Sequence, residues 1–229
     1  MGDGDRMPVL LRTQTPRVTS ADPGHAGFLR PHEHGARMMR LSLLLGLALV
    51  PVGWACAWTG GMTGHMAGHM IAVAIAAPLL AWGLAATSLD PATRWPRAAS
   101  PMAAMVVELA VVWGWHLPAA RALADGGGAW FVVEQASFLL AGFWLWSAVL
   151  GVGRERRAAG VGALLLTSMH MTLLGALVGL APRTLYGHSH GLQDQQLGGV
   201  VMLMVGAGSY LLGGLAMLGT LLTTREASA

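Results

Sequence analysis

The sequence predicts an all-α membrane protein, a polytopic helical bundle of about six transmembrane helices with both termini in the cytoplasm. Composition, the spacing of the apolar runs and the placement of arginine support this fold class. Of the 229 residues, 54% are hydrophobic and 11% are charged, and the mean hydropathy is +0.55, which lies outside the usual range of soluble domains. Because open sheet edges cannot be satisfied in lipid, we expect every span to be a helix.

Six apolar runs are long enough to cross a bilayer, which takes about 17 to 25 apolar residues in a helix. Arginine, which supplies all 14 basic residues, lies mainly before the first run, between the second and third, between the fourth and fifth, and after the sixth. The positive-inside rule therefore places these connections and both termini in the cytoplasm. The runs cover residues 41–58, 66–89, 101–118, 129–150, 159–181 and 198–222.

The chain divides into three parts. Residues 1–38 are polar, rich in Pro, Gly and Arg, and without apolar periodicity, so we interpret them as a disordered tail or as a stretch upstream of the true start codon. Residues 39–58 combine Arg40, an apolar run and the small residues Ala55 and Ala57, as in a secretory signal, and are either a signal peptide or the first transmembrane helix. Residues 59–224 form the transmembrane bundle.

Composition also excludes some functions. The basic residues form no patch with interleaved aromatic residues, so nucleic acid is not an expected partner. The single cysteine, Cys56, excludes a disulfide framework and a two-thiolate metal site. Any metal chemistry therefore depends on imidazole, thioether or carboxylate groups.

The segment His65-Met66-Ala67-Gly68-His69-Met70 sets two imidazoles and two thioethers one helical turn apart, at the outer end of the second span. Thioether sulfur favours Cu(I), and imidazole binds both Cu(I) and Cu(II). Residues four apart share one face of a helix, so such a pair can close on one metal ion. Methionine and interfacial histidine also occur as structural residues, but two copies of His-Met in register favour a copper site.

Further candidate ligands lie on other spans. His116 closes the third span, and Glu134 lies about one turn into the fourth, where a carboxylate is costly unless it is paired, protonated or bound to metal. His170 and Met171 repeat the His-Met pairing nearer the bilayer middle and could form a relay with the outer pair. The structural alternatives are interfacial hydrogen bonding for His116, a helix N-terminus for Glu134 and a bridge between helices for His170. The predicted metal ligands are His65, Met66, His69, Met70, His116, Glu134, His170 and Met171.

Three polar features remain outside this set. Glu108, deep in the third span, fits a protonated carboxyl bonded between helices, with a place in a proton path, better than a ligand. Asp194 is expected to cap the last helix, which points Gln195 at the outer cavity. His188 and His190 lie in the last outer loop and can be incidental.

Several of these segments resemble the CtaG family of cytochrome c oxidase assembly factors. The resemblance runs from about residue 60 to the C-terminus, and the combination of the doubled His-Met with Asp-Gln-Gln-Leu-Gly-Gly is specific to this family. It implies a multi-pass protein of the bacterial inner (cytoplasmic) membrane, needed to mature a copper-containing terminal oxidase at the copper delivery step. The segments are 65–70, 77–80, 115–118, 134–138, 175–186 and 194–199, and the matching motif residues are His65, Met66, His69, Met70, His116, Glu134 and Asp194.

The favoured hypothesis is a non-enzymatic assembly factor that takes Cu(I) from the outer aqueous side and passes it to an oxidase subunit. The expected partners are cytochrome c oxidase subunits, the lipid bilayer and periplasmic copper chaperones. One alternative is a heme-binding membrane oxidoreductase with axial ligands from His69, His116 and His170, which requires two histidines facing each other at matched depth. Another is a copper transporter, which needs polar groups continuing to the cytoplasmic side, where only Glu108 lies.

Overall fold

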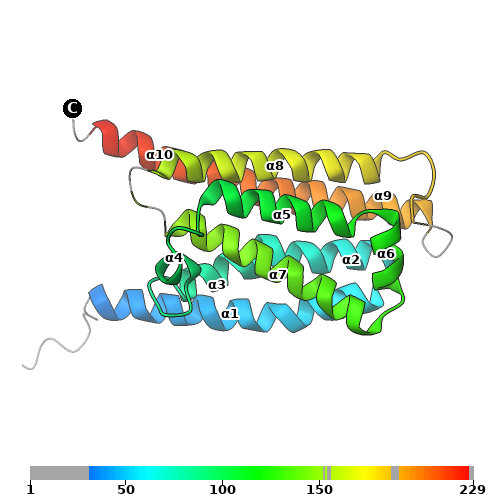
Figure 1. Ribbon diagram of the computed structural model, residues 1–229, viewed down its shortest axis with the longest axis horizontal. Helices are drawn as coiled ribbons and strands as arrows, with labels where there is room; N and C mark the ends of the chain where they lie inside the picture. The colour runs from blue at the N-terminus through cyan, green and yellow to red at the C-terminus, as the bar shows by residue number, and fades with distance from the viewer. Residues whose placement is uncertain (1–30, 152, 154–155, 187–190, 227–229) are drawn as a thin grey trace, which may run out of the picture.

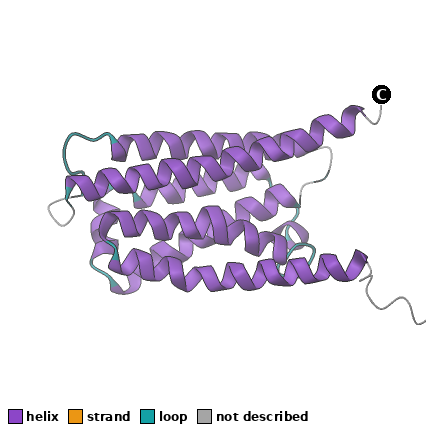
Figure 2. Ribbon diagram, turned by 180° about the vertical axis from the view of Figure 1, so that it is seen from behind, coloured by secondary structure: helices purple, strands orange, loops and turns teal. Residues whose placement is uncertain are grey.

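The computed structural model describes residues 31–151, 153, 156–186 and 191–226. All regular structure in these residues is helical (Figure 2), which confirms the predicted all-α class. Five stretches are long and apolar enough to cross a membrane, and a sixth is a helix pair bent by 72°. The stretches are Gly35–Thr59, Gly61–Gly83, Gly128–Leu150, Arg157–Gly179 and Leu192–Thr223, and the bent pair is Pro101–Trp115 with Pro118–Asp125.

Two of these stretches change helix type along their length. The second span and the last span each contain six residues of π-helix between α-helical parts, and such segments are frequent at functional sites. In chain order the elements are α1 (Pro31–Thr59), α2 (Gly61–Met70), η1 (Ile71–Ala76), α3 (Ala77–Gly83), α4 (Pro91–Arg94), α5 (Pro101–Trp115), α6 (Pro118–Asp125), α7 (Gly128–Leu150), α8 (Arg157–Gly179), α9 (Leu192–Val201), η4 (Met202–Ala207) and α10 (Gly208–Glu226).

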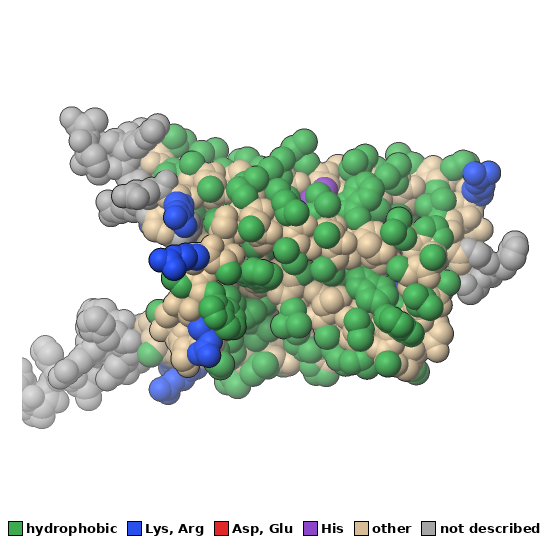
Figure 3. Space-filling model, in the orientation of Figure 1, with side chains coloured by type: hydrophobic (Ala, Val, Ile, Leu, Met, Phe, Trp, Pro, Cys, Tyr) green, Lys and Arg blue, Asp and Glu red, His purple; other side chains and the backbone are tan. Residues whose placement is uncertain are grey.

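The long helices run side by side along the long axis of the molecule (Figure 1). The short helix α6 crosses one end of the bundle, and α4 lies at the other end, where α1 begins and α10 finishes. Figure 3 shows arginine side chains gathered at the α4 end and only sparse at the opposite end, with apolar side chains over the surface between. The two ends of the described chain therefore share one end of the bundle.

The first helix is longer than the sequence predicts. Helix α1 begins at Pro31, so residues 31–38, which the sequence assigns to a disordered tail, are helical. Extending a helix that already exists adds one hydrogen bond per residue fixed, so a helix formed in the apolar run grows into polar residues at little cost. Residues 1–30 lie outside the described part of the chain.

A proline breaks the third span. The predicted span 101–118 is straight only to Trp115; Leu117 is extended, and Pro118 begins α6. Proline lacks an N–H and disfavours helical geometry in the residue before it, so the chain turns there. The turn carries α6, and Arg121 with it, across the end of the bundle.

Close packing of α2 on α1 decides which face of α2 points inward. A Cβ atom at Gly64 would lie 2.3 Å from the carbonyl oxygen of Cys56, and one at Gly68 would lie 2.4 Å from that of Gly53. Only glycine permits this approach of two helix backbones. The opposite face of α2, with its histidines and methionines, is therefore turned toward α5, α7 and α9.

Candidate metal centre

The four histidines and methionines of the doubled His-Met segment are buried within one end of the bundle. His65 is 3% exposed, His69 and Met66 are 0% exposed, and Met70 is 1% exposed. They occupy the end of the bundle that α6 covers, next to α7 and α9. They therefore lie at one end of the second span and beneath the surface of the protein.

Three imidazoles from two helical segments meet at this point. The ring centroids of His69 and His116 are 5.4 Å apart, those of His65 and His116 are 5.5 Å apart, and those of His65 and His69 are 6.4 Å apart. Phe138 of α7 stacks on His69 at 4.0 Å and closes one side of the group. We call His65, His69, His116 and Met66 the histidine cluster.

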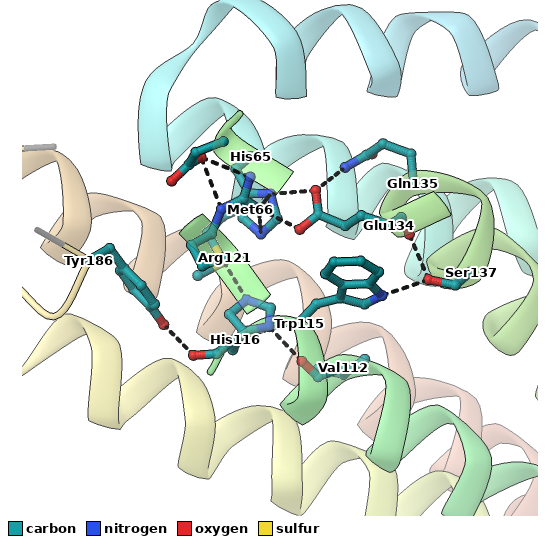
Figure 4. Close-up of polar contacts among 11 residues, drawn as sticks. His65, Met66, Val112, Trp115, His116, Arg121, Glu134, Gln135, Ser137 and Tyr186 are labelled. Atoms are coloured by element: carbon teal, nitrogen blue, oxygen red, sulfur yellow. Dashed lines mark hydrogen bonds and ion pairs between the residues drawn. The ribbon is translucent and has the colours of Figure 1, made fainter. Parts of the chain in front are cut away.

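Hydrogen bonding sets the tautomer of His116. Its Nδ1 lies 2.7 Å from the carbonyl oxygen of Val112, which can only accept, so Nδ1 carries the proton (Figure 4). In the neutral ring Nε2 is then unprotonated, and it lies 3.4 Å from the Sδ atom of Met66. Two lone-pair donors thus face each other without a proton between them.

The backbone of His116 is also held in place. The Tyr186 hydroxyl donates to the carbonyl oxygen of His116 at 3.2 Å. Burial raises the pKa of Tyr186 to about 12, so the phenol keeps its proton at physiological pH and remains a donor. His116 is therefore fixed at both its ring and its main chain.

A buried ion pair lies beside the cluster. The guanidinium of Arg121, 4% exposed, contacts Oε1 of Glu134, which is 0% exposed, and its Nη1 lies 2.6 Å from Nδ1 of His65 (Figure 4). Arg121 also pairs with Asp125 at 2.8 Å, and the Gln135 amide donates to Glu134 at 3.2 Å. Glu134 is thus a paired carboxylate, and Nη1 of Arg121 lies within hydrogen-bonding distance of both ring nitrogens of His65, at 2.6 and 3.3 Å.

Arg121, which pairs with Glu134 beside the cluster, is a residue that the sequence analysis does not single out. The available signal was its position, because an isolated arginine on the side that the positive-inside rule disfavours needs a specific partner. Asp125, four residues later, is a possible ion-pair partner of this arginine, but nothing in the sequence identifies Glu134 as the second partner.

The deeper His-Met pair lies close to the cluster. His170 of α8 is 7% exposed, and a charge on its ring would act on His69. A Cβ atom at Gly206 of η4 would lie 2.6 Å from Sδ of Met70 and 3.8 Å from Sδ of Met171. The structure therefore brings the thioethers of α2 and α8 to one glycine.

Asp194 and Gln195 do not act as the sequence predicts. Asp194 is the third residue of α9, and its carboxylate accepts from the backbone N–H groups of Met62 (2.7 Å) and Thr63 (3.0 Å), so it caps α2 and not its own helix. Gln195 accepts from the Leu185 N–H at 2.7 Å and does not point into an outer cavity. The predictions failed because the partners belong to other segments, and the contacts depend on how these segments pack against α9. Both residues connect α9 to neighbouring segments and thereby position the cluster.

Glu108 and the two loop histidines are the remaining polar features indicated by the sequence. Glu108 lies between helices as predicted, since its carboxyl contacts the hydroxyl of Tyr210 on α10. His188 and His190 lie outside the described residues. In the described part of the chain, no three side chains among His, Cys, Asp and Glu converge as a metal site requires. A metal centre here therefore needs sulfur as well as imidazole.

A cavity lies beside His65 at this end of the bundle. It has a volume of about 330 Å³, and its lining includes His65, Arg121, Asp125, Trp58 and Phe131. It is lined by both polar and apolar groups. The cavity therefore reaches the edge of the histidine cluster at His65.

The apolar helices define a multi-pass membrane protein. A buried imidazole–thioether cluster lies at one end of its bundle. The family model described as "Cytochrome c oxidase caa3 assembly factor (Caa3_CtaG)" matches residues 41–224, and the chain belongs to this family. The family associates the protein with cytochrome c oxidase and implies a non-catalytic role in assembly. No curated protein and no solved structure matches the chain.

Proposed function

We propose that this assembly factor binds Cu(I) at the histidine cluster and delivers it to an oxidase subunit on the extracytoplasmic side of the bacterial inner membrane. The observation that carries the proposal is the contact of 3.4 Å between Nε2 of His116 and Sδ of Met66. Neither atom has a proton to donate, so the contact gains nothing as a hydrogen bond. A cation between the two atoms would make the contact favourable, because each atom can donate a lone pair to it.

The spacing of the cluster fits one soft metal ion. With metal–nitrogen and metal–sulfur distances near 2.0 and 2.3 Å and tetrahedral angles, the nitrogen and sulfur lie about 3.5 Å apart and two imidazole centroids about 5 Å apart. The corresponding separations are 3.4 Å for His116 and Met66 and 5.4 Å for His69 and His116. Imidazole and thioether are the donors that suit Cu(I).

His69 supports the same assignment. It is 0% exposed, and neither of its ring nitrogens has a hydrogen-bond partner among the described residues. Buried polar atoms are almost always satisfied, so a histidine in this state needs a ligand or an ordered water. Met66, His69 and His116 form the proposed binding set, and His65 joins it when Arg121 moves fully onto Glu134 and Asp125.

Met70, Met171 and His170 form a second group of soft donors further along the bundle. Their sulfurs flank Gly206, and both nitrogens of His170 lack a partner in the described residues. Exchange between uncharged thioethers requires no proton movement, which suits transfer. We propose this group as the next station of the ion after the cluster.

The distribution of arginine supports the proposed orientation of the protein. Arg37, Arg40, Arg94 and Arg97 belong to the end of the bundle where α1 starts and α4 lies, whereas Arg121 at the other end is neutralised by Glu134. The positive-inside rule then assigns the α6 end to the extracytoplasmic side. Copper would reach the cluster through the cavity beside His65.

Sidedness can be measured with cysteine labelling. With Cys56 replaced by Ala, a cysteine introduced at Gly126 should react with a membrane-impermeant maleimide in intact spheroplasts, and one at Ala92 should react only after lysis. Gly126 lies in the connection after α6, and Ala92 lies in α4. The reverse pattern would place the cluster on the cytosolic side and contradict extracytoplasmic delivery.

Copper binding is tested by anaerobic Cu(I) titration of the purified protein in detergent, with a competing chelator. We expect at least one tight site in the wild type and an affinity at least about tenfold lower in Met66→Leu and His116→Gln, since each loses one of about three ligands. Met204→Leu is the control, because Met204 lies in η4 of the last span, is 73% exposed and is not part of the cluster.

Metal analysis of protein purified without added metal separates this function from the heme alternative. Copper without a Soret band supports the proposal, and a Soret band would favour heme. If the Met66→Leu, His116→Gln and control proteins bound copper with equal affinity, the cluster would not be the copper site.

A further inference from the structure

A second polar group lies in the middle of the bundle, away from the histidine cluster. Glu108 of α5 is 0% exposed, and its Oε1 contacts the hydroxyl of Tyr210. That hydroxyl also lies 3.2 Å from the carbonyl oxygen of Val73 in η1, which accepts in addition from Nε1 of Trp146 at 3.1 Å. Segments from α5, α7, α10 and η1 thus meet at one carboxyl group.

The contacts of Tyr210 indicate that Glu108 is protonated. If Glu108 were ionised, the single phenol proton would face two acceptors, Oε1 of Glu108 and the carbonyl oxygen of Val73. If Glu108 carries a proton, the carboxyl donates to the phenol oxygen and the phenol donates to Val73, so each contact has one proton. Neutrality also avoids the high cost of an ionised carboxylate inside a bilayer.

The surroundings of Glu108 contain no compensating positive charge. Among the described residues no ion pair involves Glu108. The titratable group in contact with it is Tyr210, Trp146 approaches from α7, and α8 presents Thr167, with His170 one turn further on. Oε2 of Glu108 and Oγ1 of Thr167 have no hydrogen-bond partner in the described part of the chain. The site therefore has room for a change of protonation but no fixed cation.

A cation in the histidine cluster creates a need for negative charge. Arg121 already neutralises Glu134, and Asp125, the other acidic group there, is 31% exposed, so water screens its charge. Glu108 lies in α5, and His116 caps the C-terminal end of the same helix. The eight residues between the two positions correspond to about 12 Å along the helix axis. Among the described residues, Glu108 is a fully buried carboxyl without a charged partner. Its ionisation can therefore supply negative charge to balance a cation in the cluster.

We propose that cation binding in the cluster promotes release of the proton of Glu108, so that uptake of Cu⁺ is coupled to loss of H⁺. This inference rests on the proposed function. Cu⁺ enters the cluster from outside, the carboxyl of Glu108 becomes a carboxylate in part of the molecules, and the proton leaves to the aqueous phase. The lost proton offsets part of the added charge, so binding leaves less uncompensated charge in the membrane.

The test is proton release during anaerobic titration with the acetonitrile complex of Cu(I), in weak buffer with a pH indicator. We expect the wild type to release up to about half a proton more per bound copper than Glu108→Gln, as follows from a coupling of about one pKa unit, because glutamine keeps the shape and has no proton to lose. The copper affinity of the wild type should rise about tenfold between pH 6 and pH 8, as expected for charges about 12 Å apart at an effective dielectric constant near 20. The Glu108→Gln protein should show a correspondingly smaller rise.

Tyr210→Phe is the positioning control. It retains the carboxyl and should still release a proton, with its pH dependence displaced. Equal proton release and equal pH dependence in the wild type and Glu108→Gln, with copper bound by both, would overturn this inference and leave the proposed function standing. Failure of the wild type to bind copper would overturn both.

An infrared measurement on the wild type keeps the test valid if Glu108→Gln does not fold. The metal-free protein should show the band of a protonated buried carboxyl, and the band should weaken when copper is added. A band that is unchanged by copper would contradict the exchange.

Discussion

Replacing Arg121 with Leu should lower the free energy of unfolding by about 3–5 kcal/mol, because it leaves the buried carboxylate of Glu134 without its counter-charge. Glu134 is 0% exposed, and its remaining side-chain donor is the amide of Gln135 at 3.2 Å. The measurement is reversible unfolding in mixed detergent–denaturant micelles, with the yield of folded protein as a second readout.

The two partners of this pair should differ in their effects. Glu134→Gln leaves Arg121 paired with Asp125 at 2.8 Å, so we expect a smaller loss, about 1–3 kcal/mol. The double variant Arg121→Leu/Glu134→Gln should recover part of the loss of Arg121→Leu, since no uncompensated charge remains. Arg183→Ala, at an exposed arginine outside the cluster, is the control. Equal stability of Arg121→Leu and this control would show that the ion pair contributes nothing.

Replacing His65 and His69 together with Ala should abolish most of the copper content and activity of the oxidase that depends on this protein. His69 is a proposed ligand, and His65 holds Arg121 beside the cluster at 2.6 Å, so the double change removes both a ligand and the group that would complete the site. The measurements are metal content and oxygen consumption of membranes from cells that carry the variant as their only copy.

The amount of inserted variant must be followed in the same membranes, because loss of the protein would also lower oxidase activity. Met169→Ala is the control, since Met169 is 66% exposed next to His170 and lies outside the proposed copper route. A fully copper-loaded oxidase in cells that carry only the His65→Ala/His69→Ala protein would exclude the cluster from delivery.

The sequence predicted those features that depend on side-chain chemistry and on spacing within one helix. The apolar runs predicted the spans because the bilayer imposes a minimum length and requires helices. Positions 65, 66, 69 and 70 were recognised as one group because residues three and four apart share a helix face. The family that these segments resemble is the one whose model matches residues 41–224.

Distant partners were not accessible in this way. Asp194 was expected to cap its own helix, but its carboxylate binds the N–H groups of Met62 and Thr63, more than 130 positions away. Gly61, which has a φ of +63° and lies against that carboxylate, is the complementary feature on α2. Neither residue predicts the other, because the interaction depends on how α9 packs beside α2.

The sequence by itself determined the helical class, the spans and the soft-donor character of the candidate site, since these depend on hydropathy, bilayer thickness and side-chain chemistry. Only the tertiary structure decided that His116 meets Met66, that Arg121 neutralises Glu134 and that Tyr210 joins Glu108. The reason is geometric: these contacts link different helices, and their distances are set by backbone packing at Gly64 and Gly68 and by the turn at Pro118. Periodicity describes one helix at a time and contains no information on these contacts.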